Sequence, residues 1–238
     1  MSRYPQRHSR RTFVKELAFG AVAVGLGTAR VSNGYAQSTG RQPQGVLTGT
    51  DFDLRIGPIP INITGSDRTA YAVNGSVPAP LLRWREGDTV TLRVANSLRE
   101  DASIHWHGIQ VPNNMDGIPD ETQKPIQPGE TFTYEFIAKP AGTYWYHSHF
   151  DSDKQISVGL SGAFIIDPPG GLVSRPDIDK VLMLNEWRVI DGQTYAAMPA
   201  TGMDGNFFTI NGKSYPETET IEAKVGQKIR LRFIGSGQ

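Results

Sequence analysis

Apolar and polar residues alternate along short stretches of this chain with a period of two. Clear examples are residues 89–94, 131–136 and 228–233, in which every second side chain is apolar. A period of two places alternate side chains on opposite faces of a β-strand. Glycine, proline, asparagine and aspartate separate the stretches, as at residues 86–88 and 128–129, and these residues favour turns. The pattern predicts an all-β sandwich or barrel without an amphipathic helix.

Two parts of the chain repeat one another. Residues 73–75, Val-Asn-Gly, precede the strand pattern of residues 87–94, and residues 210–212, Ile-Asn-Gly, precede the similar pattern of residues 226–233. The motifs recur in the same order at nearly the same offset, which indicates two copies of one domain. The expected join is the segment 167–171, which is rich in proline and glycine.

The second copy is shorter than the first. His105 follows Arg93 in the first copy, whereas the chain stops soon after the matching Arg232. Half of a sandwich would expose strand edges and an apolar face, so we expect the chain to be a fragment of a longer protein. The expected organisation is a signal peptide at residues 1–36, a linker at 37–45, one complete domain at 46–170 and the start of a second, incomplete domain at 171–238.

The composition narrows the chemistry. The 238 residues carry 24 basic and 24 acidic side chains, so no global field favours nucleic acid or an anionic membrane surface. Cysteine is absent, which removes disulfides, thiolate zinc sites, iron–sulfur ligation and cysteine nucleophiles. We therefore expect no nucleic-acid partner and no stable membrane anchor.

The N-terminus has the pattern of an export signal. Arg10 and Arg11 precede an apolar run from Leu17 to Leu26, and small residues stand at Gly34 and Ala36. The run is too short to span a bilayer. This arrangement is typical of a twin-arginine signal peptide cleaved after Ala36. The expected location is periplasmic or otherwise extracytoplasmic.

Paired histidines are the strongest chemical signal. All four histidines after the signal peptide lie in two His-x-His pairs, His105-Trp106-His107 and His147-Ser148-His149. Each pair closes a β-patterned run, so we expect both imidazoles of a pair on one face of a strand and the middle residue on the other. If the two strands are neighbours, four imidazoles converge. Imidazole suits copper, zinc, iron or nickel, with divalent copper leading the affinity order, so the spacing alone leaves the metal open.

These motifs resemble the first two copper-binding motifs of the multicopper oxidases, a family that includes laccases and bacterial copper-resistance oxidases. The resemblance rests on residues 105–108 and 145–149, on the connecting segments 115–119 and 122–129, and on the strand pattern of 159–164. It is strong over residues 46–170 and weak beyond. It implies a cupredoxin-like Greek-key β-sandwich, with one complete domain and the start of a second.

The resemblance also implies that the chain carries half of the ligands of a trinuclear copper cluster. By motif position, His105 would bind the type 2 copper. The type 3 copper pair would be bound by His107, His147 and His149. Asp116 matches an acidic residue that assists proton delivery during oxygen reduction in this family, although a plain turn residue is the other interpretation. The remaining ligands would come from a missing domain or from a neighbouring subunit.

The implied function is one-electron oxidation of a small reducing substrate, a phenol or a metal ion, coupled to reduction of dioxygen to water. The sequence departs from the family in lacking the later motifs, including the cysteine of the type 1 copper, so we expect the 238 residues alone to be inactive. One alternative is a non-catalytic extracytoplasmic copper-binding or copper-resistance protein. A cupin-type metal protein is a weaker alternative, because no histidine follows His149 and no glutamate follows it closely.

Overall fold

A computed structural model describes residues 45–63, 65, 67–190, 193–194 and 205–236. The expected signal peptide and all but the last residue of the expected linker lie outside the described residues. Within them, the only helices are the 3-10 turn η1 (Asn113–Met115) and the four-residue helix α2 (Ser152–Gln155). Neither is long or apolar enough to cross a membrane. The prediction of an all-β chain is confirmed for this part of the molecule.

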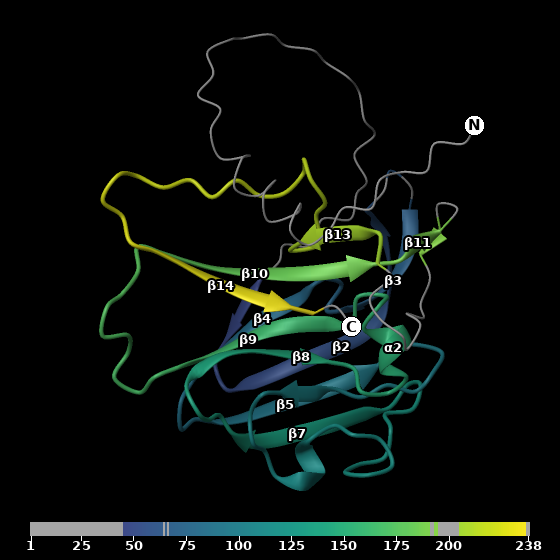
Figure 1. Cartoon of the computed structure of the whole chain (residues 1–238). Helices are drawn as coiled ribbons and strands as arrows, with labels where there is room; N and C mark the ends of the chain where they lie inside the picture. Colours follow the sequence, from purple (N-terminus) through teal and green to yellow (C-terminus); the bar gives the residue numbers. More distant parts are fainter. Residues whose placement is uncertain (1–44, 64, 66, 191–192, 195–204, 237–238) are drawn as a thin grey trace, which may run out of the picture. The chain divides into compact units, whose positions relative to one another are not determined.

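The first copy of the repeat forms two sheets. In spatial order, the five-stranded sheet contains β1 (Val46–Thr48), β4 (Ala79–Arg85), β9 (Ser161–Asp167), β8 (Gly142–His147) and β6 (His105–His107). The four-stranded sheet contains β3 (Asp67–Val73), β2 (Asp51–Asn62), β5 (Thr89–Asn96) and β7 (Thr131–Ile137). Strands far apart in sequence pair in parallel, as β4 does with β9 and β2 with β5 (Figure 1). Parallel neighbouring strands must be joined by long crossover connections.

Alternate side chains of both sheets fill one core. Leu54 and Leu92 enter it from the four-stranded sheet, and Trp84 and Phe164 enter it from the five-stranded sheet. The Trp84 ring centroid lies 4.9 Å from that of Phe164 and 5.9 Å from that of Trp106. Burying one large aromatic side chain removes about 150–250 Å² from water and contributes on the order of 4 kcal/mol before entropy is counted. The period-two pattern therefore builds a sandwich whose interior is aromatic.

The second copy of the repeat forms its own three-stranded sheet. Its strands, in spatial order, are β13 (Phe207–Ile210), β10 (Ile178–Trp187) and β14 (Ile229–Gly235). β10 pairs antiparallel with β13 and parallel with β14, as β2 pairs with β3 and β5. Two short strands, β11 (Val189–Ile190) and β12 (Gln193–Thr194), pair beside it. The two copies share one pattern of strand pairing.

The corners after β3 and β13 show the repeat in detail. Asn74 and Asn211 both have positive φ angles, 50° and 51°, a conformation that asparagine tolerates. The Asn74 side chain accepts a hydrogen bond from the Arg55 amide at 2.7 Å and donates one to the Asp53 carbonyl at 3.1 Å. Asn211 makes the same two bonds to β10, at 2.9 and 3.0 Å. This supports two copies of one domain, while the boundary at residue 170 stays a prediction.

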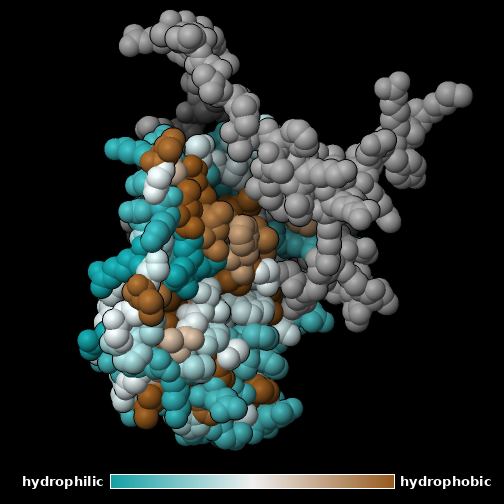
Figure 2. Space-filling view, turned by 60° about the vertical axis from the view of Figure 1, so that its left-hand side comes forward, coloured by the Kyte–Doolittle hydropathy of each residue, from teal (hydrophilic) through white to brown (hydrophobic). Residues whose placement is uncertain are grey.

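The two copies differ in how their apolar faces are covered. In β5, every second side chain is fully buried, including Leu92. In β14, the side chains of Ile229, Leu231 and Phe233 are 46%, 42% and 61% exposed. Figure 2 shows apolar surface in brown in the upper part of the molecule. Among the described residues, the inner face of β14 is therefore much more open than its counterpart in the first copy.

Candidate metal centre

The two His-x-His pairs lie on neighbouring strands. β6 and β8 pair antiparallel, with His105 directly opposite His147 and Trp106 opposite Tyr146. The ring centroids of His105 and His147 are 5.3 Å apart. Trp106 is fully buried in the core, and the two strands bring the histidine segments together, as the sequence predicts.

Three imidazoles present nitrogen atoms to one small space. Ring nitrogens of His105, His107 and His147 all lie within 4.8 Å of one another. Nδ1 of His107 is 3.3 Å from Nε2 of His147. His149 is adjacent, with its ring centroid 5.5 Å from that of His105 and 6.2 Å from that of His147. All four predicted histidines therefore gather at one end of the sandwich.

The second pair departs from the predicted strand geometry. β8 ends at His147, so Ser148 and His149 lie beyond the strand. The Ser148 amide donates to the Leu160 carbonyl at 3.2 Å, and the His149 amide donates to the Ser103 hydroxyl at 3.3 Å. The prediction that both pairs lie on strands is wrong for this pair, because loop hydrogen bonds replace the strand ladder. Ser148 is nevertheless fully buried.

Backbone carbonyl groups orient two of the imidazoles. Nδ1 of His105 lies 2.7 Å from the Asp116 carbonyl oxygen, and Nδ1 of His147 lies 2.8 Å from the Ser148 carbonyl oxygen. A carbonyl oxygen only accepts, so each Nδ1 carries a proton and donates it. This tautomer leaves the lone pair of Nε2 available to a metal ion.

Burial keeps two of the histidines in the form that binds metals. The pKa of His147 falls to about 4 because burial disfavours the charged ring; the hydrogen bond to the Ser148 carbonyl opposes this, and the neighbouring imidazoles add repulsion. Burial also lowers the pKa of His107, with repulsion from His105 and His149. Neutral imidazole is the ligand form, so both side chains are ready donors at neutral pH.

Asp116 lies beside the cluster. Its carboxylate Oδ1 is 3.3 Å from Nδ1 of His105, in addition to the contact made by its carbonyl group. The residue follows η1 directly and precedes Gly117, which has a φ of 80°. The turn therefore holds the carbonyl oxygen and one carboxylate oxygen of Asp116 against one histidine. The structure brings together all five residues that the sequence singled out.

Trp145 contacts two of the histidines, which sequence reasoning did not anticipate. Its ring centroid is 4.1 Å from that of His147, with nearly parallel planes, and 5.0 Å from that of His107. It also packs against an apolar cluster that contains Met183 and Ile234 of the second copy. The contact with His107 depends on the pairing of β6 with β8, whereas Trp145 and His147 lie two residues apart on β8 and so face the same side of that strand.

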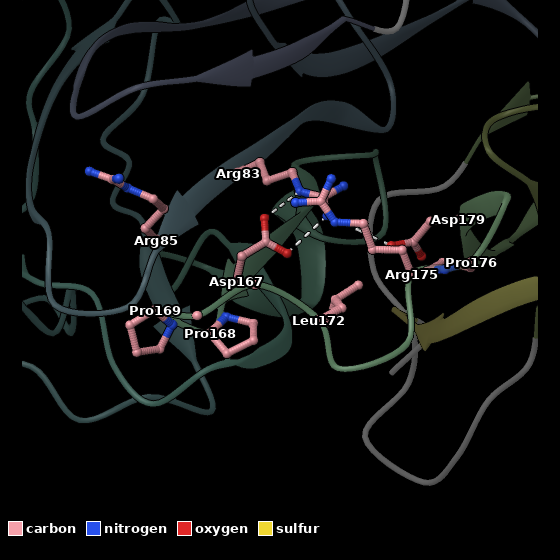
Figure 3. Close-up of a pocket in the computed structure, with 11 residues that line it drawn as sticks. Arg83, Arg85, Asp167, Pro168, Pro169, Leu172, Arg175, Pro176 and Asp179 are labelled. Atoms are coloured by element: carbon pink, nitrogen blue, oxygen red, sulfur yellow. Dashed lines mark hydrogen bonds and ion pairs between the residues drawn. The ribbon is translucent and has the colours of Figure 1, made fainter.

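A separate cleft lies where the two copies meet, and no histidine lines it. Arg83 forms two hydrogen bonds to Asp167, at 2.6 and 2.9 Å, and lies 3.7 Å from Asp179 (Figure 3). Asp179 also accepts two hydrogen bonds from Arg232, at 2.7 and 2.8 Å. Arg232 in turn donates to Thr143 of β8 at 2.5 Å. This cleft is an ion-pair junction between the copies.

A family model and curated relatives of this chain point to the same protein family. Residues 55–171 match the family model described as multicopper oxidase. Copper resistance protein A of Pseudomonas syringae pv. tomato is 51% identical over 181 residues, which cover 76% of this chain and 29% of that protein. Copper resistance protein A of Escherichia coli is 48% identical over 204 residues, covering 85% of this chain and 33% of that protein. The chain thus spans about a third of these curated relatives.

Solved structures agree with these sequence matches. The blue copper oxidase from Nitrosomonas europaea is 40% identical, with a TM-score of 0.72, and the match covers 79% of this chain and 61% of that one. A multicopper oxidase from Pseudomonas thermotolerans is 34% identical, also with a TM-score of 0.72, covering 81% of this chain and 47% of that one. These matches confirm the predicted cupredoxin-like fold.

Proposed function

The chain belongs to the multicopper oxidase family through the domain at residues 55–171, and from this premise we propose that its four paired histidines bind copper in an oxygen-reducing cluster. The observation that carries the proposal is the convergence of ring nitrogens from His105, His107 and His147 within 4.8 Å. Residues on two different strands supply them, so the arrangement depends on the fold and not on a flexible segment.

The donor set fits copper. All four side chains in the cluster are imidazoles, a donor type that suits divalent copper well. His105 and His147 have their Nδ1 protons held by carbonyl groups, and such outer contacts fix ligand orientation and raise ligand basicity. Copper bound there would supply one-electron redox chemistry toward dioxygen. The protein's part is to hold the imidazoles in place.

We assign the individual histidines by motif position. His105 would bind a type 2 copper ion, and the other three histidines would bind the type 3 pair. A trinuclear cluster needs further ligands, so a further domain or a neighbouring subunit would complete it. Support for the assignment comes from the resemblance of the two motifs to those of the family.

Asp116 is proposed to assist proton transfer. Reduction of dioxygen to water consumes four protons, and a positioned carboxyl group accelerates such transfers. Its Oδ1 is 3.3 Å from Nδ1 of His105, which supports a place beside the cluster. The test uses this chain with its cluster completed by the further domain or subunit. In that protein, Asp116→Asn should lower kcat for oxygen reduction at unchanged copper content. An unchanged kcat and pH profile would reject this role.

The whole reaction is proposed at the level of its class. A small reducing substrate, a phenol or a metal ion, would give up electrons one at a time, and dioxygen would accept them. The twin-arginine pattern at residues 1–36 supports export of the protein to an extracytoplasmic compartment. The names of the curated relatives, copper resistance protein A, support a role in copper handling.

One observation favours a second candidate function. The sequence has no cysteine, and a type 1 copper site needs a thiolate ligand. The 238 residues by themselves would then bind copper without turnover, as a copper-binding or copper-resistance protein does. Oxygen consumption with a phenol or ferrous ion distinguishes this chain acting alone from a complete oxidase.

Copper stoichiometry and electron paramagnetic resonance of the purified chain test the proposal. We expect the parent to bind Cu²⁺ with a nitrogen-rich spectrum. A variant with His105→Ala and His147→Ala should lose this copper. Equal binding and an equal spectrum in both proteins would place the metal elsewhere, and a folded parent without any copper would overturn the claim that these residues bind it unaided.

A further inference from the structure

A buried glutamine, Gln155, forms hydrogen bonds to residues beside both histidine pairs. Gln155 is the last residue of α2 and has no exposed surface. Its carbonyl oxygen Oε1 accepts a hydrogen bond from the Ser148 hydroxyl at 2.6 Å. Its amide nitrogen Nε2 donates to the Asp101 carbonyl at 2.8 Å and to Glu100 Oε1 at 3.1 Å. The carbonyl oxygen and the amide nitrogen of this side chain are therefore both hydrogen-bonded, and each of the three bonds goes to a different residue.

The partners of Gln155 lie next to the two metal-binding motifs. Ser148 stands between His147 and His149, at the point where the chain leaves β8. Asp101 lies in the segment that leads directly into β6, four residues before His105. A single side chain therefore joins the exit of one histidine segment to the entrance of the other.

Other residues hold Glu100 and α2 in place. Glu100 forms an ion pair with Lys154 of α2, and it also interacts with the Tyr71 hydroxyl of β3. The Gln155 carbonyl accepts the Leu160 amide at 3.0 Å, which fixes α2 against the start of β9. Both the Glu100 partner of Gln155 and the helix that carries Gln155 are therefore fixed by further contacts.

We propose that Gln155 is a positioning residue, which sets the relative placement of the two His-x-His pairs by holding Ser148 and Asp101 together. This deepens the proposed function and rests on it, because the consequence is the geometry offered to copper. His149 lies beyond the strand ladder, so β pairing alone does not fix it. Outer contacts of this kind typically change metal affinity by about 10–100-fold.

Gln155→Met tests the proposal, since methionine has a similar length and removes all three side-chain hydrogen bonds. Gln127→Met at an exposed loop position controls for the substitution itself. Leu92→Ala, in the core on β5, controls for loss of stability without touching the histidine loops. Ser148→Ala removes the hydroxyl group that donates to Gln155 Oε1.

The first measurement is made without copper. Imidazole ¹⁵N and ¹H resonances should shift for histidines of both pairs in Gln155→Met, and should match the parent in Gln127→Met and Leu92→Ala. Parent-like imidazole resonances in Gln155→Met, or equal shifts in Leu92→Ala, would overturn the positioning role. This readout stands even if the parent binds no copper, in which case the proposed function fails and the positioning proposal is still decided.

The second measurement uses Cu²⁺ alone as the probe. Gln155→Met should bind it at least about tenfold more weakly and give an altered paramagnetic resonance spectrum. The double variant with Ser148→Ala should lose less affinity than the product of the two single losses, because both remove the same bond. A parent-like spectrum and affinity in Gln155→Met, or purely multiplicative losses, would reject the proposal.

Discussion

A β-carbon at Gly117 would lie 1.9 Å from the carbonyl oxygen of Ile104. No real β-carbon approaches a backbone oxygen so closely, so the turn after Asp116 reaches β6 only because residue 117 is glycine. Ile104 precedes His105, and the contact therefore fixes the turn against the base of the proposed metal site. The positive φ of 80° at Gly117 is a second reason for glycine at this position.

Gly117→Ala should consequently destabilise the fold severely. Gly129 offers a matched control, because its φ is 84° and nothing lies within 4 Å of a β-carbon there. Gly129→Ala should cost about 1–2 kcal/mol from backbone strain alone, and Gly117→Ala should cost at least about 2 kcal/mol more. Urea unfolding measures both values. Equal losses in the two variants would show that the close approach to Ile104 does not matter.

The ion pairs between the copies predict a dependence on pH. The pKa of Asp179 lies below the ordinary aspartate value, chiefly because Arg232 donates hydrogen bonds to it. A lowered carboxyl pKa stabilises the fold above the unfolded value, near about 3.9, and this contribution is lost as pH falls through the lowered pKa. Asp179→Asn should lower the free energy of unfolding at pH 7 by about 1–3 kcal/mol, and the difference should shrink below about pH 4.

The equivalent pair in the first copy is the control for that experiment. Arg93 and Asp51 occupy the matching strands, but the Asp51 side chain is 64% exposed whereas that of Asp179 is 14% exposed. Water screens exposed pairs, so Asp51→Asn should change stability less than Asp179→Asn does. A loss that is equal in size for both, or independent of pH for Asp179→Asn, would contradict the argument.

Much of the fold follows from local sequence signals. The strands 89–96 and 131–137 coincide with alternating stretches, and the repeat of Val-Asn-Gly as Ile-Asn-Gly marks corners with the same geometry. The convergence of the histidines could be predicted because spacing of two residues and strand adjacency are simple rules. Cupredoxin-like topology came from resemblance, since alternation alone does not set the order of strands in a sheet.

The contacts that support the site could not be predicted in the same way. Gln155 lies in a one-turn helix, and its three partners are 7 to 55 residues away. Trp145 reaches His107 only through the register of β6 with β8, and His149 leaves the strand because Ser103 and Leu160 provide loop hydrogen bonds. Each contact depends on segments brought together by the fold, so no periodicity in the sequence reveals it.

The repeated corners give a prediction that compares the two copies directly. Asn74→Ala and Asn211→Ala each remove the matching pair of side-chain hydrogen bonds to the neighbouring strand and place alanine at a φ near 50°. Each should lower the free energy of unfolding by about 1–3 kcal/mol. The bonds share no partner, so the losses should add in the double variant. Urea unfolding of the four proteins measures this, and a negligible effect at one corner would contradict equal roles.

Asp116 contacts His105 with one backbone oxygen and one carboxylate oxygen. The carbonyl oxygen lies 2.7 Å from Nδ1 of His105, whereas the carboxylate lies 3.3 Å away. Because the backbone makes the closer contact, Asp116→Asn should leave the orientation of His105 intact. Copper affinity should then stay within about threefold of the parent, far less than the 10–100-fold loss typical when an outer contact is removed.

Titration with Cu²⁺ measures this affinity, with His105→Ala as the variant that should lose the site. Gly129→Ala serves as the control for a small change in stability away from the histidines. If Asp116→Asn loses copper as His105→Ala does, the carboxylate rather than the carbonyl holds the imidazole. The retained affinity that we expect would leave the carboxylate free for proton transfer, because orienting His105 would then be the task of the backbone.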